Sequence, residues 1–172
     1  MDITKIYQKL LGHFGDSIIL GLTEADKGVK DPFITVRGDK VHRVGLYCKV
    51  EAVLACDFLQ SITGMDTGET LTCVYHLFSY THGHTLVLKA AVPRDAAVLP
   101  SSVSVWPAAN WYEREAYDLF GVTFEGHPGL RRLLLPDDWE GHPGLKDYVQ
   151  GPEYNGIPTS RENPLDLLDE EG

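Results

Sequence analysis

The chain has 172 residues, 43% of them hydrophobic, and a formal net charge of -10 from 25 acidic and 15 basic side chains. This length is typical of one domain, and a chain of this size and apolar content can bury a core, which argues against whole-chain disorder. The acidic balance, with no cluster of basic residues beyond Arg131 and Arg132, argues against nucleic acid as a partner.

The sequence also argues against a targeting segment and against cysteines that bind metal or form disulfides. No apolar run approaches the ~18 residues that a membrane span needs, and the N-terminus lacks the basic and apolar regions of a signal peptide. The three cysteines, Cys48, Cys56 and Cys73, form no Cys-x-x-Cys pair. They predict neither a disulfide framework nor an iron–sulfur cluster held by this chain alone, so we expect reduced, buried thiols in a cytoplasmic protein.

The first part of the chain predicts helices and short strands in alternation. Apolar residues recur at every third or fourth position over residues 3–14, which predicts an amphipathic helix. Two β-branched runs, 17–22 and 32–36, predict strands, and residues 42–55 predict a second helix. Its buried face would consist of Leu46, Val50, Val53 and Leu54. Residues 57–63 fit either a helix or a strand.

The second part contains the clearest β pattern. Residues 71–80 and 85–93 predict a hairpin, and residues 102–106 predict a further strand. A helix is then expected from Pro107 to about residue 120, ended by Gly121. Few helices and more strands in mixed order predict an α+β fold, a two-layer domain with a mixed sheet covered by helices on one face.

The sequence changes character after Gly121. Six prolines and many glycines follow, so this stretch cannot build a core of its own, yet it carries leucines, Trp139 and Tyr148 that a purely solvated tail would not favour. We therefore expect a globular domain over residues 1–121. Residues 122–172, which we call the strap, are expected to be an extended segment that docks on a partner.

A six-residue sequence, Glu-Gly-His-Pro-Gly-Leu, occurs twice in the strap, at 125–130 and at 140–145. In each copy the proline fixes its own φ and keeps the preceding histidine extended, while the glycines permit unusual backbone conformations. Each copy therefore predicts a corner in the chain. We expect His127 and His142 to bond local backbone rather than to bind metal or act in catalysis.

Acid–base catalysis is one alternative that the residues of the predicted third helix raise. Glu113 and Glu115 lie about 200° apart around a helix, which is a poor arrangement for paired carboxylates. Arg114 and Asp118 are four residues apart and are expected to pair with each other.

A zinc site built from His76, His82 and His84 is a second alternative, which would make the chain a free-standing hydrolase. Two of these histidines lie in a predicted turn, and no carboxylate lies near them in the sequence, so exposed turn histidines are the favoured interpretation.

Several stretches of the second half resemble one known family. They are residues 106–122, 124–128, 130–136, 138–143 and 146–148, together with 58–66 and 74–77 upstream. In this order they resemble the 30 kDa subunit family of respiratory complex I, which is the C subunit of NADH-quinone oxidoreductase. One departure is that Gly144 and Leu145 stand where the family usually has Leu-Arg, which removes an expected guanidinium.

The resemblance implies a cofactor-free structural subunit in the quinone module of the hydrophilic arm of a proton-pumping complex. NADH, FMN, iron–sulfur clusters and quinone would be bound by other subunits. The D subunit would be the main partner, with subunits B and I as further neighbours. The chain would lie on the cytoplasmic side of the cell membrane as a peripheral part of the complex. The alternative is a homologous subunit of an energy-converting hydrogenase or a related membrane-bound dehydrogenase.

The residues expected at the partner interface combine apolar anchors with orienting charges. They are Glu113, Arg114, Arg131, Arg132, Leu134, Asp138, Trp139, His142, Lys146, Asp147 and Tyr148. No catalytic, cofactor-binding or metal-binding residue is expected in this chain.

Overall fold

The structure is a computed structural model that describes residues 2–26 and 28–159. The helices are α1 (Ile3–Phe14), α2 (Val41–Val50) and α3 (Ala109–Phe120). The longer strands are β1 (Ile19–Thr23), β2 (Phe33–Arg37), β3 (Phe58–Asp66), β4 (Thr70–Ser79) and β5 (His84–Pro93). The short strands are β6 (Val98–Pro100), β7 (Thr123–Glu125), β8 (Glu153–Tyr154) and β9 (Ile157–Pro158).

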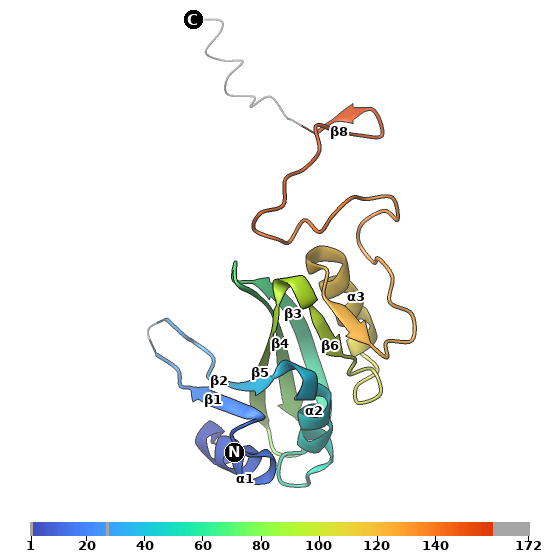
Figure 1. Cartoon of the computed structure of the whole chain (residues 1–172). Helices are drawn as coiled ribbons and strands as arrows, with labels where there is room; N and C mark the ends of the chain where they lie inside the picture. The colour runs from blue at the N-terminus through green and yellow to red at the C-terminus, as the bar shows by residue number, and fades with distance from the viewer. Residues whose placement is uncertain (1, 27, 160–172) are drawn as a thin grey trace, which may run out of the picture.

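One five-stranded sheet organises the domain, in the order β1-β2-β5-β4-β3 (Figure 1). Every neighbouring pair is antiparallel except β2 and β5, which run parallel with Phe33 opposite Val87. The predicted hairpin is formed by β4 and β5, and the ambiguous residues 57–63 fall largely in β3. The α+β fold with a mixed sheet is therefore confirmed.

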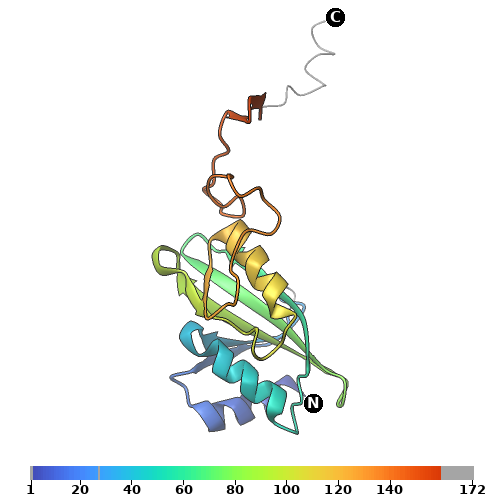
Figure 2. The same ribbon diagram turned by 90° about the vertical axis from the view of Figure 1, so that its right-hand side faces the viewer.

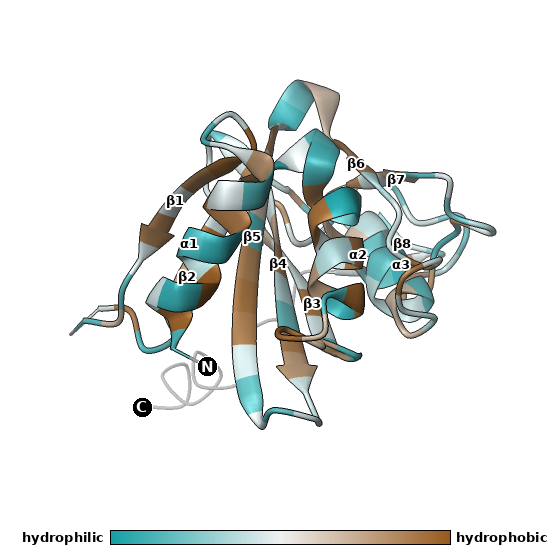
Figure 3. Cartoon of the chain, turned by 90° about the horizontal axis from the view of Figure 1, so that it is seen from below, coloured by the Kyte–Doolittle hydropathy of each residue, from teal (hydrophilic) through white to brown (hydrophobic). Residues whose placement is uncertain are grey.

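The helices lie on one side of this sheet, as Figure 2 shows. On β4 the side chains of Cys73, Tyr75 and Leu77 are buried in the core, whereas the alternating Val74 and His76 are only partly buried on the opposite face. In the view of Figure 3, β1 and β5 are largely hydrophobic and α1 shows hydrophilic segments. The core therefore sits between the sheet and the helical layer.

Helix α2 buries a different face from the predicted one. It ends at Val50, and Leu46 and Val50 are exposed, while Gly45 and Cys48 are buried. A Cβ at Gly45 would lie 2.9 Å from the ring of Trp106, so the indole can pack only where the helix carries no side chain. Val53 is also exposed, and Leu54 alone of the predicted face is buried.

The strand predicted at residues 102–106 is wrong. These residues form a turn in which the carbonyl oxygen of Ser102 accepts hydrogen bonds from the N–H groups of Val105 and Trp106. The strand instead lies just before the turn, at β6, and it pairs in parallel with β7 after α3. Gly121 ends α3 as predicted, with a left-handed φ of 76° that turns the chain toward β7.

No helix in the described ranges is both long and apolar enough to cross a bilayer.

Candidate partner interface

Asp118, in the last turn of α3, is the point at which the strap joins the domain. Its fully buried carboxylate accepts hydrogen bonds from three consecutive backbone N–H groups, those of Leu133, Leu134 and Leu135, at 2.9, 2.7 and 2.9 Å. Nη1 of Arg132 lies 2.7 Å from the other carboxylate oxygen. Burial alone would raise the pKa of Asp118, but these hydrogen bonds and the guanidinium lower it below its ordinary value. The carboxylate therefore stays ionised and fixes four successive strap residues.

Arg132 also folds the strap back on itself. Its Nη2 donates to the carbonyl oxygens of Trp139 and Gly141 at 2.7 and 3.0 Å. His142 then bonds the carbonyl oxygen of Asp118 through Nδ1 at 2.9 Å, and Gly144 donates its N–H to the carbonyl oxygen of Leu119 at 2.8 Å. Residues 132–144 thus form a loop closed on the end of α3.

A second attachment lies at the end of β3. The buried carboxylate of Asp66 accepts hydrogen bonds from the N–H groups of Lys146 and Gly68, at 2.9 and 2.8 Å. Nη2 of Arg94 bridges Asp66 at 3.0 Å and Asp147 at 2.5 Å. The hydrogen bond from Lys146 is the largest cause that lowers the pKa of Asp66. These contacts hold the strap against the sheet as well as against α3.

Arg114 does not form the predicted pair with Asp118. Its guanidinium donates to the carbonyl oxygens of Arg131 and Arg132, at 3.2 and 2.9 Å, and lies 5.1 Å from the ring centroid of Trp111. Arg132, reached across a loop, takes the place beside Asp118 instead. Arg114 and Asp118 of α3 therefore position the strap within this chain.

Glu113 is buried inside the domain. Its carboxyl group accepts hydrogen bonds from Oγ of Ser101 at 2.7 Å and from the N–H of Ser102 at 2.6 Å. Burial raises the pKa of Glu113 to about 7, against the lowering effect of these two donors. Glu115 is exposed on another face of α3, so the two carboxyl groups do not form an acid–base pair.

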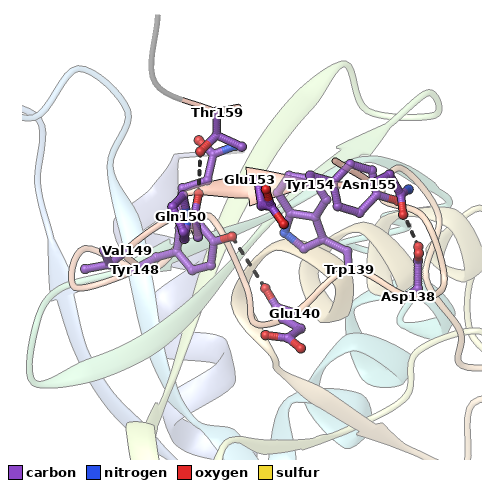
Figure 4. Close-up of a pocket in the computed structure, with 12 residues that line it drawn as sticks. Asp138, Trp139, Glu140, Tyr148, Val149, Gln150, Glu153, Tyr154, Asn155 and Thr159 are labelled. Carbon is purple, nitrogen blue, oxygen red and sulfur yellow. Dashed lines mark hydrogen bonds between the residues drawn. The ribbon is translucent and has the colours of Figure 1, made fainter. Parts of the chain in front are cut away.

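The other predicted interface residues lie further along the strap. Leu134 is 61% exposed, although its backbone N–H is held by Asp118. Trp139 is half-buried against Tyr154, with ring centroids 5.0 Å apart, and the hydroxyl of Tyr154 donates to Asp138 at 2.8 Å. Tyr148 donates to the carbonyl oxygen of Glu140 at 3.4 Å, and it lines a pocket of the strap opposite Trp139 and Tyr154 (Figure 4).

The histidines of the repeated hexapeptide bond local backbone. Nε2 of His127 lies 3.1 Å from the carbonyl oxygen of Asn110, and its Nδ1 accepts the N–H of Gly129 at 3.0 Å. His142 contacts Asp118 as described above.

Of the three histidines of the zinc alternative, His82 and His84 stack with ring centroids 5.9 Å apart, but His76 does not join them. Nδ1 of His76 lies 3.2 Å from Oγ of Ser61 on the open face of the sheet. His84 is buried on the helical side, and His82 bonds the carbonyl oxygen of Ala52. Within the described ranges, no group of three or more His, Cys, Asp and Glu side chains is placed to hold a metal ion.

Sequence relatives agree on one family. The family described as "Respiratory-chain NADH dehydrogenase, 30 Kd subunit" matches residues 34–154. The C subunit of F(420)H(2) dehydrogenase from Methanosarcina mazei is 41% identical over 144 residues, which cover 80% of this chain and 85% of that protein. The C subunit of NADH-quinone oxidoreductase from Chloroherpeton thalassium is 36% identical over 154 residues, 88% of this chain and 62% of that protein. A C/D subunit of NADH-quinone oxidoreductase, from Nitrosospira multiformis, is 38% identical over 60% of this chain and 19% of its own length.

Two solved structures share the fold. A trypsin-resistant fragment of Nqo5 has a TM-score of 0.59 and 25% identity, and the match covers 76% of this chain and 100% of the fragment. A chain of the membrane-bound sulfane sulfur reductase, an archaeal respiratory membrane complex, has a TM-score of 0.66 and 22% identity, over 98% of this chain and 89% of that one. On the matched residues and these identities, the chain belongs to the 30 kDa subunit family of respiratory-chain NADH dehydrogenase.

Proposed function

We propose that this chain is a non-catalytic structural subunit in the hydrophilic arm of a membrane-bound, proton-pumping oxidoreductase, where its strap clasps the D subunit. The observation that carries the proposal is the fixed strap. Asp118 and Asp66 hold its backbone to the domain, while apolar side chains such as Leu134 face outward. The contacts that orient the strap are internal, so its exposed side chains are free to meet a partner.

The fused relative supports the D subunit as the main partner. In Nitrosospira multiformis a C/D subunit is one protein, which is expected of two chains that are neighbours in the assembled complex. Subunits B and I are the further neighbours that we propose. The complex would lie at the cytoplasmic side of the cell membrane.

Electron carriers would be bound by other subunits, namely NADH, FMN, iron–sulfur clusters and quinone. The cysteines support this division. Burial raises the pKa of Cys56 and of Cys73 to about 12, so both thiols are protonated near neutral pH. The thiolate is the form that binds iron or zinc, so a metal would have to displace these protons from buried thiols.

NADH is the proposed electron donor for the complex. A second candidate is F(420)H(2), because the Methanosarcina mazei protein is 41% identical and is matched over most of its length. The alternative raised by the sequence, a subunit of an energy-converting hydrogenase or a related membrane-bound dehydrogenase, includes this second candidate. Both candidates give this chain the same structural role and differ in the donor that feeds the complex.

The test is to tag this chain in its native host, solubilise membranes gently and identify the proteins that co-purify. The eluate is assayed for quinone reduction with NADH and, separately, with F(420)H(2). We expect subunits B, D and I together with activity from one donor, and that donor decides between the two candidates. Recovery of the chain without other subunits would overturn the structural role.

A matched pair of variants tests the strap itself. Leu134→Glu places a charge on the exposed strap leucine, whereas Leu20→Glu does the same on edge strand β1, where Leu20 is 56% exposed. We expect recovery of the D subunit to fall at least ~10-fold for Leu134→Glu only, since an unpaired charge in an interface core costs more than the ~1.4 kcal/mol that changes affinity tenfold. Equal recovery from both variants would contradict the strap as the clasp.

A further inference from the structure

The strap forms an open pocket of about 420 Å³ (Figure 4). It is lined by Asp138, Trp139, Glu140, Tyr148, Val149, Gln150, Gly151, Pro152, Glu153, Tyr154, Asn155 and Thr159. Every lining residue belongs to the strap, which is the segment proposed above to meet the D subunit. The chemistry of the pocket can therefore indicate what kind of group a partner places in it.

The pocket is acidic and holds no cation of its own. Asp138, Glu140 and Glu153 contribute carboxylates, and none of the lining residues is Lys or Arg. Across residues 2–26 and 28–159, none of these three carboxylates forms an ion pair. Asp138 is oriented by the hydroxyl of Tyr154 at 2.8 Å, a hydrogen bond that is the first cause of the raised pKa of Tyr154. A positive group would meet no competing cation among the lining residues.

Aromatic rings form the rest of the wall. The rings of Trp139 and Tyr154 are inclined at 49° with centroids 5.0 Å apart, and in Figure 4 the indole lies between Glu153 and Tyr154. The face of an indole attracts a guanidinium or ammonium group, and Arg also stacks on such a ring. Carboxylates beside aromatic faces are thus a fitting environment for a basic side chain.

One donor in the pocket lacks a partner. Nε1 of Trp139 is buried and, in the described part of the chain, has no hydrogen-bond acceptor. A buried N–H without an acceptor is unfavourable, and buried indole N–H groups usually find one.

We propose that this pocket receives an Arg or Lys side chain from a segment of a neighbouring subunit, with the cation held by the acidic and aromatic wall. The proposal rests on the proposed function and adds the chemistry of the contact. Charge complementarity selects this occupant, because the pocket lining contains three acidic residues and no basic one.

Cross-linking identifies the occupant directly. Val149 lines the pocket and is 85% exposed, so a photoreactive benzoylphenylalanine in its place reaches whatever enters without breaking a described hydrogen bond. The tagged chain is irradiated in native membranes, and the cross-linked peptide is sequenced. Val50, 66% exposed on α2, serves as the control position. We expect an adduct from Val149 only, with a peptide of another subunit that contains Arg or Lys.

A charge exchange tests the role of the cation. Glu153→Lys should lower recovery of the cross-linked subunit by about tenfold, and replacing its identified basic residue with Glu should restore recovery. Glu69→Lys, on the exposed turn between β3 and β4, should have no effect.

Three results would overturn the proposal. They are an adduct confined to this chain or a second copy of it, no adduct with another subunit, and equal recovery for Glu153→Lys and Glu69→Lys. If Leu134→Glu still releases the D subunit in that last case, the proposed clasp stands and only the cation pocket fails.

Discussion

Asp118 and Arg132 face each other across the junction of helix and strap, with Nη1 of Arg132 2.7 Å from Oδ1 of Asp118. The second oxygen of Asp118 is at the same time surrounded by three successive backbone N–H groups. One buried carboxylate thus serves as the counter-ion of a strap side chain and as the acceptor for strap backbone. This double use makes the position of residues 132–135 depend on a single charge.

The first prediction concerns that charge. Asp118→Asn keeps the size of the side chain but leaves the partly buried guanidinium of Arg132 without its counter-ion, at a cost of about 3 kcal/mol in unfolding free energy. Hydrogen exchange of the amides of residues 133–135 should accelerate. Glu115→Gln, on an exposed position of the same helix, is the control and should change neither quantity. Unchanged protection in Asp118→Asn would show that the strap is held by other contacts.

The second prediction compares the two carboxylates that Arg94 bridges. The Asp66 side chain is 1% exposed and that of Asp147 is 67% exposed. We expect Asp147→Asn to have little effect on the unfolding free energy, as for other exposed ion pairs. Asp66→Asn should cost more, about 3 kcal/mol, because a buried pair loses a partner. Urea unfolding of the full chain measures both, and equal effects would contradict this ranking.

Both of these carboxylates have a lowered pKa, Asp66 chiefly through the N–H of Lys146 and Asp147 chiefly through Arg94. The unfolded state binds protons more readily at these sites, so their contribution is present near neutral pH. It is lost as the pH falls below about 4, through the folded-state values. The difference between wild type and Asp66→Asn should therefore shrink in acid.

Glu113 gives the opposite pH dependence. Its pKa is raised from 4.5 to about 7, so between these values the folded state keeps a proton that the unfolded state has lost. Unfolding free energy should fall as the pH rises through this window and level off above it. Burial lowers the pKa of His84, so its contribution to the unfolding free energy rises with pH instead. The effect of Glu113 is therefore measured by comparing wild type with a variant of Glu113.

Glu113→Gln is that variant. The amide resembles the protonated carboxyl, since its oxygen can accept the N–H of Ser102 while its NH₂ donates to Oγ of Ser101. Thermal unfolding at pH 5 and pH 8 should show the variant gaining stability relative to wild type at the higher pH. A constant difference between the two proteins would contradict a proton held at Glu113.

Two glycines of the strap differ in the space around them. A Cβ at Gly144 would lie 2.8 Å from the carbonyl oxygen of Leu119 and from the ring of Phe120, whereas a Cβ at Gly129 would meet nothing within 4 Å. Gly144→Ala should therefore displace the strap and cost about 1–3 kcal/mol, as overpacked sites do. Gly129→Ala should be nearly neutral, and limited proteolysis of the strap distinguishes the two. Equal resistance would mean that the approach at Gly144 can relax.

The sequence patterns predicted the fold class because the hairpin and the helices have clear periodicity. They failed at α2, where the buried face consists of Val41, Val44, Gly45 and Cys48 rather than of Leu46 and Val50. The reason is the Trp106 ring, which requires an absent side chain at Gly45 and is contributed from a distant segment. The buried residues do recur at helical spacing, but a glycine that faces a tryptophan cannot be distinguished in the sequence from one on an exposed face.

The same limit applies to the strap. Helical spacing favoured Arg114 as the partner of Asp118. The partner is instead Arg132, which lies 14 residues further along the chain in the strap. Asp66 and Arg94 were not predicted, and no local spacing marks them, since their link to Asp147 spans strands and strap. Leu134, Trp139 and Tyr148 could be singled out because apolar residues in a Pro- and Gly-rich segment need a surface to cover them. Their interface role stays a prediction.

The parallel pairing of β2 with β5 has a consequence for synthesis. A ribosome makes α1, β1 and β2 well before β5, and until β5 emerges the inner edge of β2 has no strand to pair with. The buried residues Ile6, Leu10 and Ile34 must therefore remain without a completed core while the intervening chain is translated. Non-local strand pairing of this kind closes late and slowly. A nascent chain stalled before His84 would present its N-terminal apolar residues to chaperones.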